Sequence, residues 1–160
     1  MKTILLGTDG SPGARRATHE AVELAAETGW PLRILSVWSV PPLELSAAPM
    51  MAGELAEVAR DRAQEALDDA AGEAADAGIA AITYLRQGDV PKQILELAEL
   101  IGDVVIVVGS DGRGAIGRAL LGSVSTRLVH TAPCPVMVVR PATRADSVES
   151  ALELAGRGLR

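Results

Sequence analysis

A glycine-rich loop is the first segment of the chain whose residue types suggest chemistry. It begins at Gly109, directly after the five β-branched residues 104–108, and contains five glycines up to Gly122. Glycines allow a main chain to approach a ligand without interference from a Cβ atom. Ser123 and Ser125 follow in a segment of helical character, and the free N–H groups at a helix start suit a phosphate. The loop therefore predicts a site for a phosphorylated ligand. The simpler alternative is a flexible connection whose serines only cap the helix.

Neither of two widespread nucleotide-binding motifs accounts for this loop. The Walker A pattern, Gly-x4-Gly-Lys-Ser/Thr, does not occur in the sequence. The dinucleotide pattern Gly-x-Gly-x2-Gly is matched at residues 112–117, but that motif needs an acidic residue about twenty positions further on for the ribose. No Asp or Glu occurs between Asp111 and Asp146, so we interpret the match as accidental.

A second group of polar residues follows the first predicted strand. Residues 3–8 form a short apolar run, which is typical of a strand buried on both faces, and Asp9 and Ser11 come soon after it. A carboxylate at position 9 can face a ligand, or it can cap the helix that Pro12 begins. The two roles are compatible, so Asp9 is a candidate site residue under either.

The elements that must position these loops alternate between strand and helix. Strands are predicted at residues 3–8, 32–40, 79–86, 104–108 and 136–139. Helices are predicted at residues 12–29, 53–77, 89–101 and 122–131. This alternation predicts a single-domain α/β fold with a parallel sheet and helices on both faces. In such sheets ligands bind beyond the carboxyl ends of the strands, where the winding reverses, so the loops at Asp9 and Gly109 should carry the site.

Three separated motifs resemble those of the universal stress proteins. The nucleotide-binding signature of that family, Gly-x2-Gly-x9-Gly-Ser/Thr, is filled without a gap by Gly109, Gly112, Gly122 and Ser123. Residues 8–11, Thr-Asp-Gly-Ser, and residues 132–136, Ala-Pro-Cys-Pro-Val, extend the resemblance in the same order. The resemblance covers residues 1–141 as one domain. It leaves residues 142–160 as a C-terminal extension, either a short amphipathic helix or a disordered tail.

The resemblance implies a fold, a ligand and a set of binding residues. The fold would be a Rossmann-like sheet of the adenine nucleotide alpha hydrolase type, with five parallel strands in the order 3-2-1-4-5. The ligand would be ATP, or AMP or ADP, bound with Mg²⁺ or Mn²⁺, and Asp9 would meet the ribose or the phosphate-bound metal. Val37 and Val108 would line the adenine pocket. The implied nucleotide-binding residues are Thr8, Asp9, Val37, Val108, Gly109, Gly112, Arg113, Gly122, Ser123, Val124 and Ser125.

One residue of the loop departs from the pattern of the family. Asp111 stands where relatives commonly carry a basic or neutral polar residue. A carboxylate beside a triphosphate is unfavourable unless a cation offsets it, and Arg113 and Arg118 lie in the same loop. The sequence therefore leaves open a weaker affinity for ATP or a preference for a less charged nucleotide.

The residues of the two loops favour binding over rapid turnover. Fast phosphoryl transfer needs a positioned base, metal ligands and a cationic clamp, and the loops offer only Asp9, serines and two arginines. We therefore expect a nucleotide-dependent regulatory protein of the stress response, with at most slow hydrolysis and no catalytic residue. The alternatives are an ATP hydrolase or nucleotidyl-transfer enzyme on the same fold, and a dimeric interaction module that binds no nucleotide.

Composition and charge exclude several other classes of protein. Fifteen basic and twenty-one acidic residues give a net charge of −6, which is unsuited to a nucleic acid backbone. The longest uncharged stretch, residues 128–139, has twelve residues and two prolines and is too short to span a bilayer. The single cysteine, Cys134, excludes an internal disulfide. We expect a cytoplasmic protein without a membrane or nucleic acid partner.

The last predicted strand suggests how the protein assembles. Residues 136–139 should lie at a sheet edge as an apolar strand without charge, and such an edge normally needs a cover or a partner. Pairing with a two-fold mate would remove both exposed edges, and the resemblance also implies a homodimer through this strand. The alternative is that residues 142–160 fold back over the edge.

Overall fold

A single parallel sheet organises the protein. The computed structural model describes residues 1–40, 49–110 and 121–141, and all structural statements refer to these residues. The sheet has five strands in the order β3-β2-β1-β4-β5, and every neighbouring pair is parallel. The strands are β1 (Thr3–Gly7), β2 (Leu32–Trp38), β3 (Ala81–Gln87), β4 (Val104–Gly109) and β5 (Val136–Val139). The predicted α/β fold and strand order are therefore confirmed.

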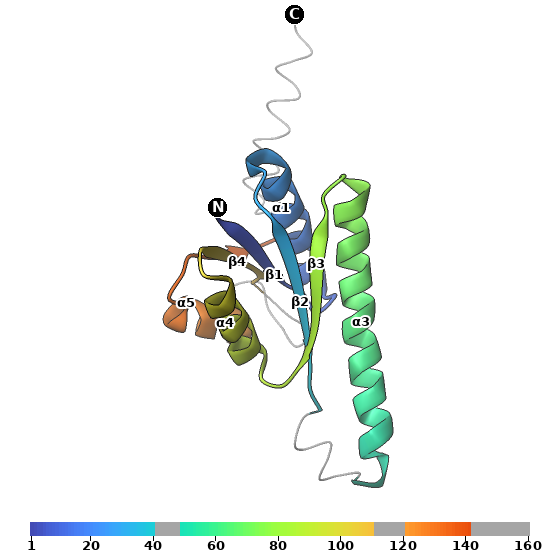
Figure 1. Ribbon diagram of the computed structural model, residues 1–160. Helices are drawn as coiled ribbons and strands as arrows, with labels where there is room; N and C mark the ends of the chain where they lie inside the picture. Colours follow the sequence, from blue (N-terminus) through green and yellow to red (C-terminus); the bar gives the residue numbers. More distant parts are fainter. Residues whose placement is uncertain (41–48, 111–120, 142–160) are drawn as a thin grey trace, which may run out of the picture.

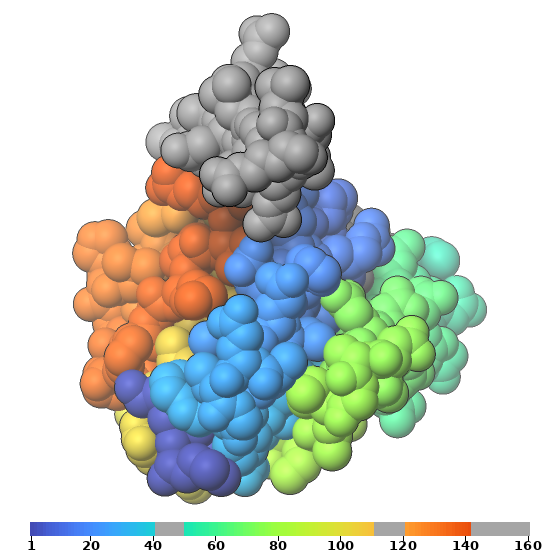
Figure 2. Space-filling view, turned by 90° about the horizontal axis from the view of Figure 1, so that it is seen from above, coloured from blue at the N-terminus to red at the C-terminus, as the bar shows by residue number. Residues whose placement is uncertain are grey.

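Helices cover both faces of the sheet (Figure 1). The helices are α1 (Pro12–Thr28), α3 (Ala52–Asp76), α4 (Val90–Ile101) and α5 (Ser123–Thr131), and a short 3-10 turn, η1 (Pro49–Met51), precedes α3. The helices α1 and α3 share one face, and α4 and α5 share the other. Seen from above, α1 lies between the β5 segment on one side and α3 and β3 on the other (Figure 2). None of the helices in the described ranges has the length and apolar character that crossing a membrane would require.

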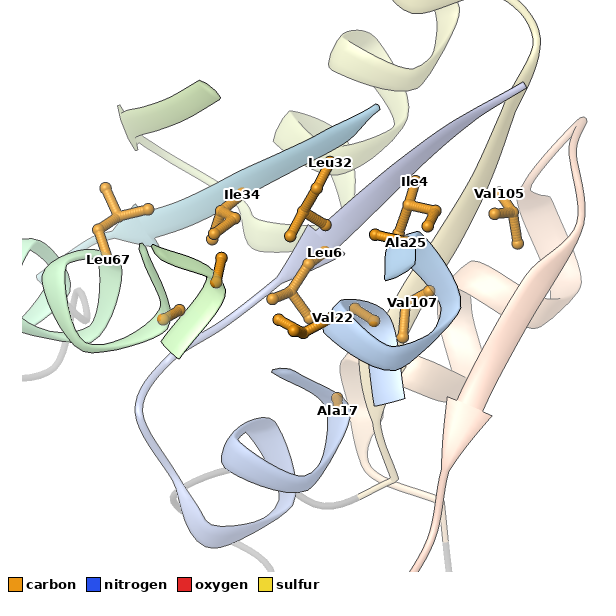
Figure 3. Packing of buried hydrophobic residues seen from close by; sticks show 13 residues of the cluster. Ile4, Leu6, Ala17, Val22, Ala25, Leu32, Ile34, Leu67, Val105 and Val107 are labelled. Atoms are coloured by element: carbon orange, nitrogen blue, oxygen red, sulfur yellow. The ribbon is translucent and has the colours of Figure 1, made fainter. Parts of the chain in front are cut away.

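The central strand is buried on both faces because its side chains alternate between the two layers. Ile4 and Leu6 pack against α1 and α3, together with Val22 of α1 (Figure 3). Leu5 points the opposite way, into the cluster formed with α4 and α5. A strand flanked by two layers of helices has no polar face, which explains why the sequence shows an apolar run instead of alternation. The core is aliphatic, as a chain with three aromatic side chains requires.

Two predicted strand boundaries were wrong by two residues. The second strand ends at Trp38 instead of Val40. The third strand begins at Ala81 instead of Ile79, because the Ile79 N–H donates to the Ala74 carbonyl at 2.8 Å and so belongs to the end of α3. The apolar character of Val40 and Ile79 suggested strand, but the hydrogen bond at the helix end determines the boundary at Ile79.

The cap of α1 is also reassigned. Ser11 is the N-cap, since its hydroxyl accepts a hydrogen bond from the Ala14 N–H at 3.2 Å. Asp9 Oδ1 accepts one from the Ser11 N–H at 3.0 Å and so stabilises the turn before the helix. The helix-capping role considered for Asp9 thus belongs to Ser11. At α4 the N-cap is Asp89, whose Oδ1 accepts the Lys92 N–H at 3.0 Å, so the predicted helix start at residue 89 is confirmed.

Candidate functional site

The two candidate loops meet at the carboxyl ends of β1 and β4. These strands are direct neighbours, with Leu6 opposite Val107, so the residues that follow them lie side by side. The connection from β1 runs through α1 on one face, whereas β4 is reached from α4 on the other face. The winding of the sheet therefore reverses between β1 and β4, which is the position where sheets of this type bind ligands.

Gly109 lies so close to α1 that no side chain fits there. A Cβ atom on Gly109 would lie 2.6 Å from the Gly13 carbonyl carbon and 2.7 Å from the Gly13 oxygen. These are main-chain atoms in the first turn of α1, so they cannot move aside as a side chain would. The absence of a side chain at Gly109 therefore lets α1 approach the end of β4, in addition to any role toward a ligand.

The two ends of the glycine-rich loop are held together. The Gly122 N–H donates to the Ser110 carbonyl at 2.6 Å, and the Ser110 N–H donates to the Val139 carbonyl at 2.8 Å. Ser125 is 2% exposed, and its hydroxyl lies 3.2 Å from the Ser110 carbonyl and 3.0 Å from the Gly122 carbonyl. A hydroxyl has one proton, so Ser125 donates to one of these two carbonyls at a time. This hydrogen bond holds the two ends of the loop together.

Among the described residues, no side chain caps the start of α5 beside this junction. Gly122 is the N-cap, and a glycine has no side chain that could accept a hydrogen bond from the first turn. The first turn of α5 carries no acidic residue, and Ser123 is exposed. Free N–H groups and the positive end of the helix dipole favour an anion at this place.

A cavity of about 390 Å³ opens beside Asp9. One wall comes from the end of β2, including Val37 and Trp38, and the other comes from α3, including Leu55 and Val58. The walls are mostly apolar, and Asp9 lines the cavity from the end of β1, the strand next to β4. The arrangement offers an anion site at α5, a carboxylate in the middle, and an apolar cavity beyond it.

Comparison with known proteins identifies the family. The sequence model described as the Universal stress protein family matches residues 1–140. The chain belongs to the universal stress protein family. A universal stress protein of Methanocaldococcus jannaschii is 32% identical over 139 residues, covering 87% of this chain and 82% of the relative.

Solved structures agree with this assignment at the level of the fold. The universal stress protein UspA from Lactobacillus plantarum superposes with a TM-score of 0.74 at 26% identity, covering 87% of this chain and 97% of that one. A universal stress protein solved in complex with cAMP has a TM-score of 0.65 at 24% identity, covering 88% and 98%.

The structure brings most of the sequence-predicted residues of this universal stress protein to one edge of the sheet. Thr8, Asp9, Gly109, Gly122 and Ser123 lie at the carboxyl ends of β1 and β4 or at the start of α5, and Val124 follows there, half-buried. The Thr8 hydroxyl is buried and accepts the Gly10 N–H at 3.3 Å. Val37 lines the cavity.

Other predicted residues are placed differently or lie outside the described residues. Val108 is 4% exposed and packs in the core between β4 and the layer of α4 and α5, where it does not line the cavity. Gly112 and Arg113 fall in residues 111–120, outside the described ranges, as do Asp111 and Arg118. Cys134 is half-buried, and burial raises the pKa of its thiol, so it remains protonated and is a poor nucleophile at neutral pH.

Sequence reasoning missed the contribution of α3 to the cavity. None of the sequence-predicted site residues lies on α3, yet Leu55, Val58, Ala59 and Arg62 line the cavity. Their spacing of three, four and seven residues was the available signal, because it places them on one face of a helix. Ser36 and Trp38 also line the cavity. They are two residues apart at the end of β2, and this spacing places both side chains on the same face of the strand.

Proposed function

We propose that this universal stress protein binds an adenine nucleotide, ATP with Mg²⁺ or Mn²⁺, across the carboxyl ends of β1 and β4. The observation that carries the proposal is the gapless signature from Gly109 to Ser123, whose two ends are joined by the Gly122–Ser110 hydrogen bond at an uncapped helix start. The relative solved with cAMP supports it, since that protein shows that this fold can hold an adenine nucleotide.

In this proposal each group around the site has a defined role. The N–H groups of the first turn of α5 and the Ser123 hydroxyl donate to phosphate oxygens, with Gly112, Arg113 and Val124 contributing from the same loop and helix start. Asp9 accepts hydrogen bonds from ribose hydroxyls or contacts the metal, and Val37 contacts the base. The metal ion offsets the charge of the triphosphate. No group of three metal-ligating side chains occurs within the described ranges, so the nucleotide itself would supply most of the ligands.

The same residues support a regulatory role over efficient catalysis. The carboxylate of Asp9 already accepts the Ser11 N–H, and its sequence neighbours among the described residues at the carboxyl ends of β1 and β4 are glycines and hydroxyl residues. Rapid phosphoryl transfer needs a positioned base and a cationic clamp as well as metal ligands. The protein would therefore act through the difference between its nucleotide-bound and free forms, with at most slow hydrolysis.

Calorimetric titration with ATP and Mg²⁺ tests this function directly. We expect saturable binding, together with phosphate release far slower than about 1 s⁻¹, the lower end for kinases. Mass spectrometry of ligand released from the purified protein should detect an adenine nucleotide. Turnover that Asp9→Ala abolishes while binding remains would instead indicate an ATP hydrolase. Absence of binding to ATP, ADP, AMP and adenosine would favour the interaction module.

We further propose that the protein is a homodimer through β5. This strand pairs only with β4 in the described sheet, so the predicted edge position is confirmed. Met137 on β5 is 38% exposed, and the strand carries no charge before Arg140. Pairing with the β5 strand of a second copy would satisfy both edges.

Met137→Lys is expected to convert the dimer to a monomer, because it introduces a charge into an apolar interface. Light scattering measures the change in mass. Leu100→Lys is the matched control, since it adds the same charge at an exposed leucine on α4 and should leave the dimer intact. A chain that ends at Pro141 should also remain dimeric. A full-length monomer would contradict the proposal, and a dimer formed only after removal of residues 142–160 would show that these residues cover the edge.

A further inference from the structure

The two halves of α3 differ in how they are held by the rest of the protein. All the buried residues of this helix lie in its second half, namely Ala63, Ala66, Leu67, Ala70 and Ala74. The first half, residues 52–62, runs past the ends of β2 and β3 (Figure 1). Its start has no side-chain cap within the described part of the chain, because Met51 occupies the N-cap position. Residues 52–62 therefore depend on weak local support.

The apolar side chains of the first half face the cavity. Leu55, Val58 and Ala59 form one stripe of the helix, and Val58 is still 48% exposed. Across the cavity lies Trp38 at the end of β2, whereas the side chain of Val37 packs toward the layer of α4 and α5. An aromatic ring on one side and an apolar stripe on the other side of a cavity of about 390 Å³ suit a planar group with apolar faces.

Two polar side chains on the same cavity are available to a ligand. Ser36 is 1% exposed, and its hydroxyl has no hydrogen-bond partner among the described residues. Arg62 lines the cavity from α3, it is exposed, and none of the ion pairs found within the described ranges includes it, although α3 is rich in acidic residues. A buried hydroxyl without a partner gains from a polar ligand, and an exposed guanidinium outside any ion pair is available to turn toward one.

We propose that the first half of α3 is the second wall of the nucleotide site and that Arg62 contacts the base. This inference rests on the proposed function. With the phosphates at the start of α5 and the ribose at Asp9, the base extends toward β2 and lies between Trp38 and the stripe of Leu55. The Arg62 guanidinium, which only donates, bonds an acceptor atom of the base. Filling the cavity buries the stripe and so orders residues 52–62.

The variant Arg62→Ala tests the contact, with adenosine and ATP as the two ligands in calorimetry. We expect affinity to fall about fivefold to tenfold, by the same factor for both, since the contact is with the base. Arg60→Ala is the matched control: Arg60 is an exposed arginine of the same half that does not line the cavity, and its loss should leave both affinities unchanged. Unchanged affinity for Arg62→Ala, or a loss confined to ATP, would overturn the placement.

Hydrogen exchange measured by mass spectrometry tests the ordering of the helix. Adenosine should slow amide exchange in residues 52–62 and leave residues 63–76 unchanged, because only the first half lacks buried contacts. If calorimetry shows binding while residues 52–62 exchange as before, the inference fails and the proposed function stands. If the unmodified protein binds neither adenosine nor ATP, the proposed function fails and this inference fails with it.

Discussion

Replacing Gly109 with alanine is expected to lower the free energy of unfolding by about 3 kcal/mol. The new Cβ atom would lie 2.6 Å from the Gly13 carbonyl carbon and 2.9 Å from the Ala14 nitrogen. Both are main-chain atoms in the first turn of α1, and the Ser11 cap fixes that turn. The helix can escape the clash only by moving away from β4, which would open the core around Ala17.

Urea unfolding followed by circular dichroism measures this loss. Gly72→Ala is the matched control, because Gly72 lies within α3 and a Cβ atom there meets nothing within 4 Å. That control should stabilise the protein by about 0.5–1 kcal/mol, since alanine favours a helix more than glycine does. Equal unfolding free energies for Gly109→Ala and the unmodified protein would show that α1 does not constrain this position.

The burial of the central strands on both faces could be predicted from the sequence, because it depends on the local pattern of apolar residues. Ile4, Leu5 and Leu6 are consecutive apolar residues, and only a strand covered on both faces buries all three. Asp89 and Gly29 marked a helix start and a helix end through the same kind of local rule. The strand order, in contrast, came from the family resemblance, since no local pattern specifies which strands pair.

Features that depend on distant segments could not be predicted. The close approach of Gly109 to Gly13 joins positions almost a hundred residues apart, so the glycine signature alone indicated only a ligand role. The cavity also depends on distant segments, because Ser36 and Arg62 line the same cavity only once α3 packs against β2. The family resemblance implied that Val108 lines the adenine pocket, but its side chain points into the core. Its direction depends on the register of β4 with β1, which the sequence does not reveal.

Replacing Gly122 with valine should reduce affinity for ATP by roughly 100-fold while leaving the fold intact. Gly122 has φ −64° and ψ 165°, an extended conformation that any residue adopts, so valine introduces no backbone strain. The Gly122 N–H would still donate to the Ser110 carbonyl. Valine is a poorer N-cap than glycine, and the change should cost about 1 kcal/mol of stability.

The expected loss arises from the branched side chain at the place where phosphate must approach the first N–H groups of α5. Adenosine has no phosphate, so its affinity should change little, and the ratio of the two affinities separates a local block from general damage. Calorimetry with both ligands and thermal unfolding of the variant measure these quantities. Gly109 and Gly122 belong to one signature, but their substitutions should have different effects. Gly109→Ala should lower stability, whereas Gly122→Val should lower ATP affinity. Unchanged ATP affinity in Gly122→Val would mean that the phosphates do not lie at the start of α5, and an equal loss for adenosine would place the nucleoside there instead.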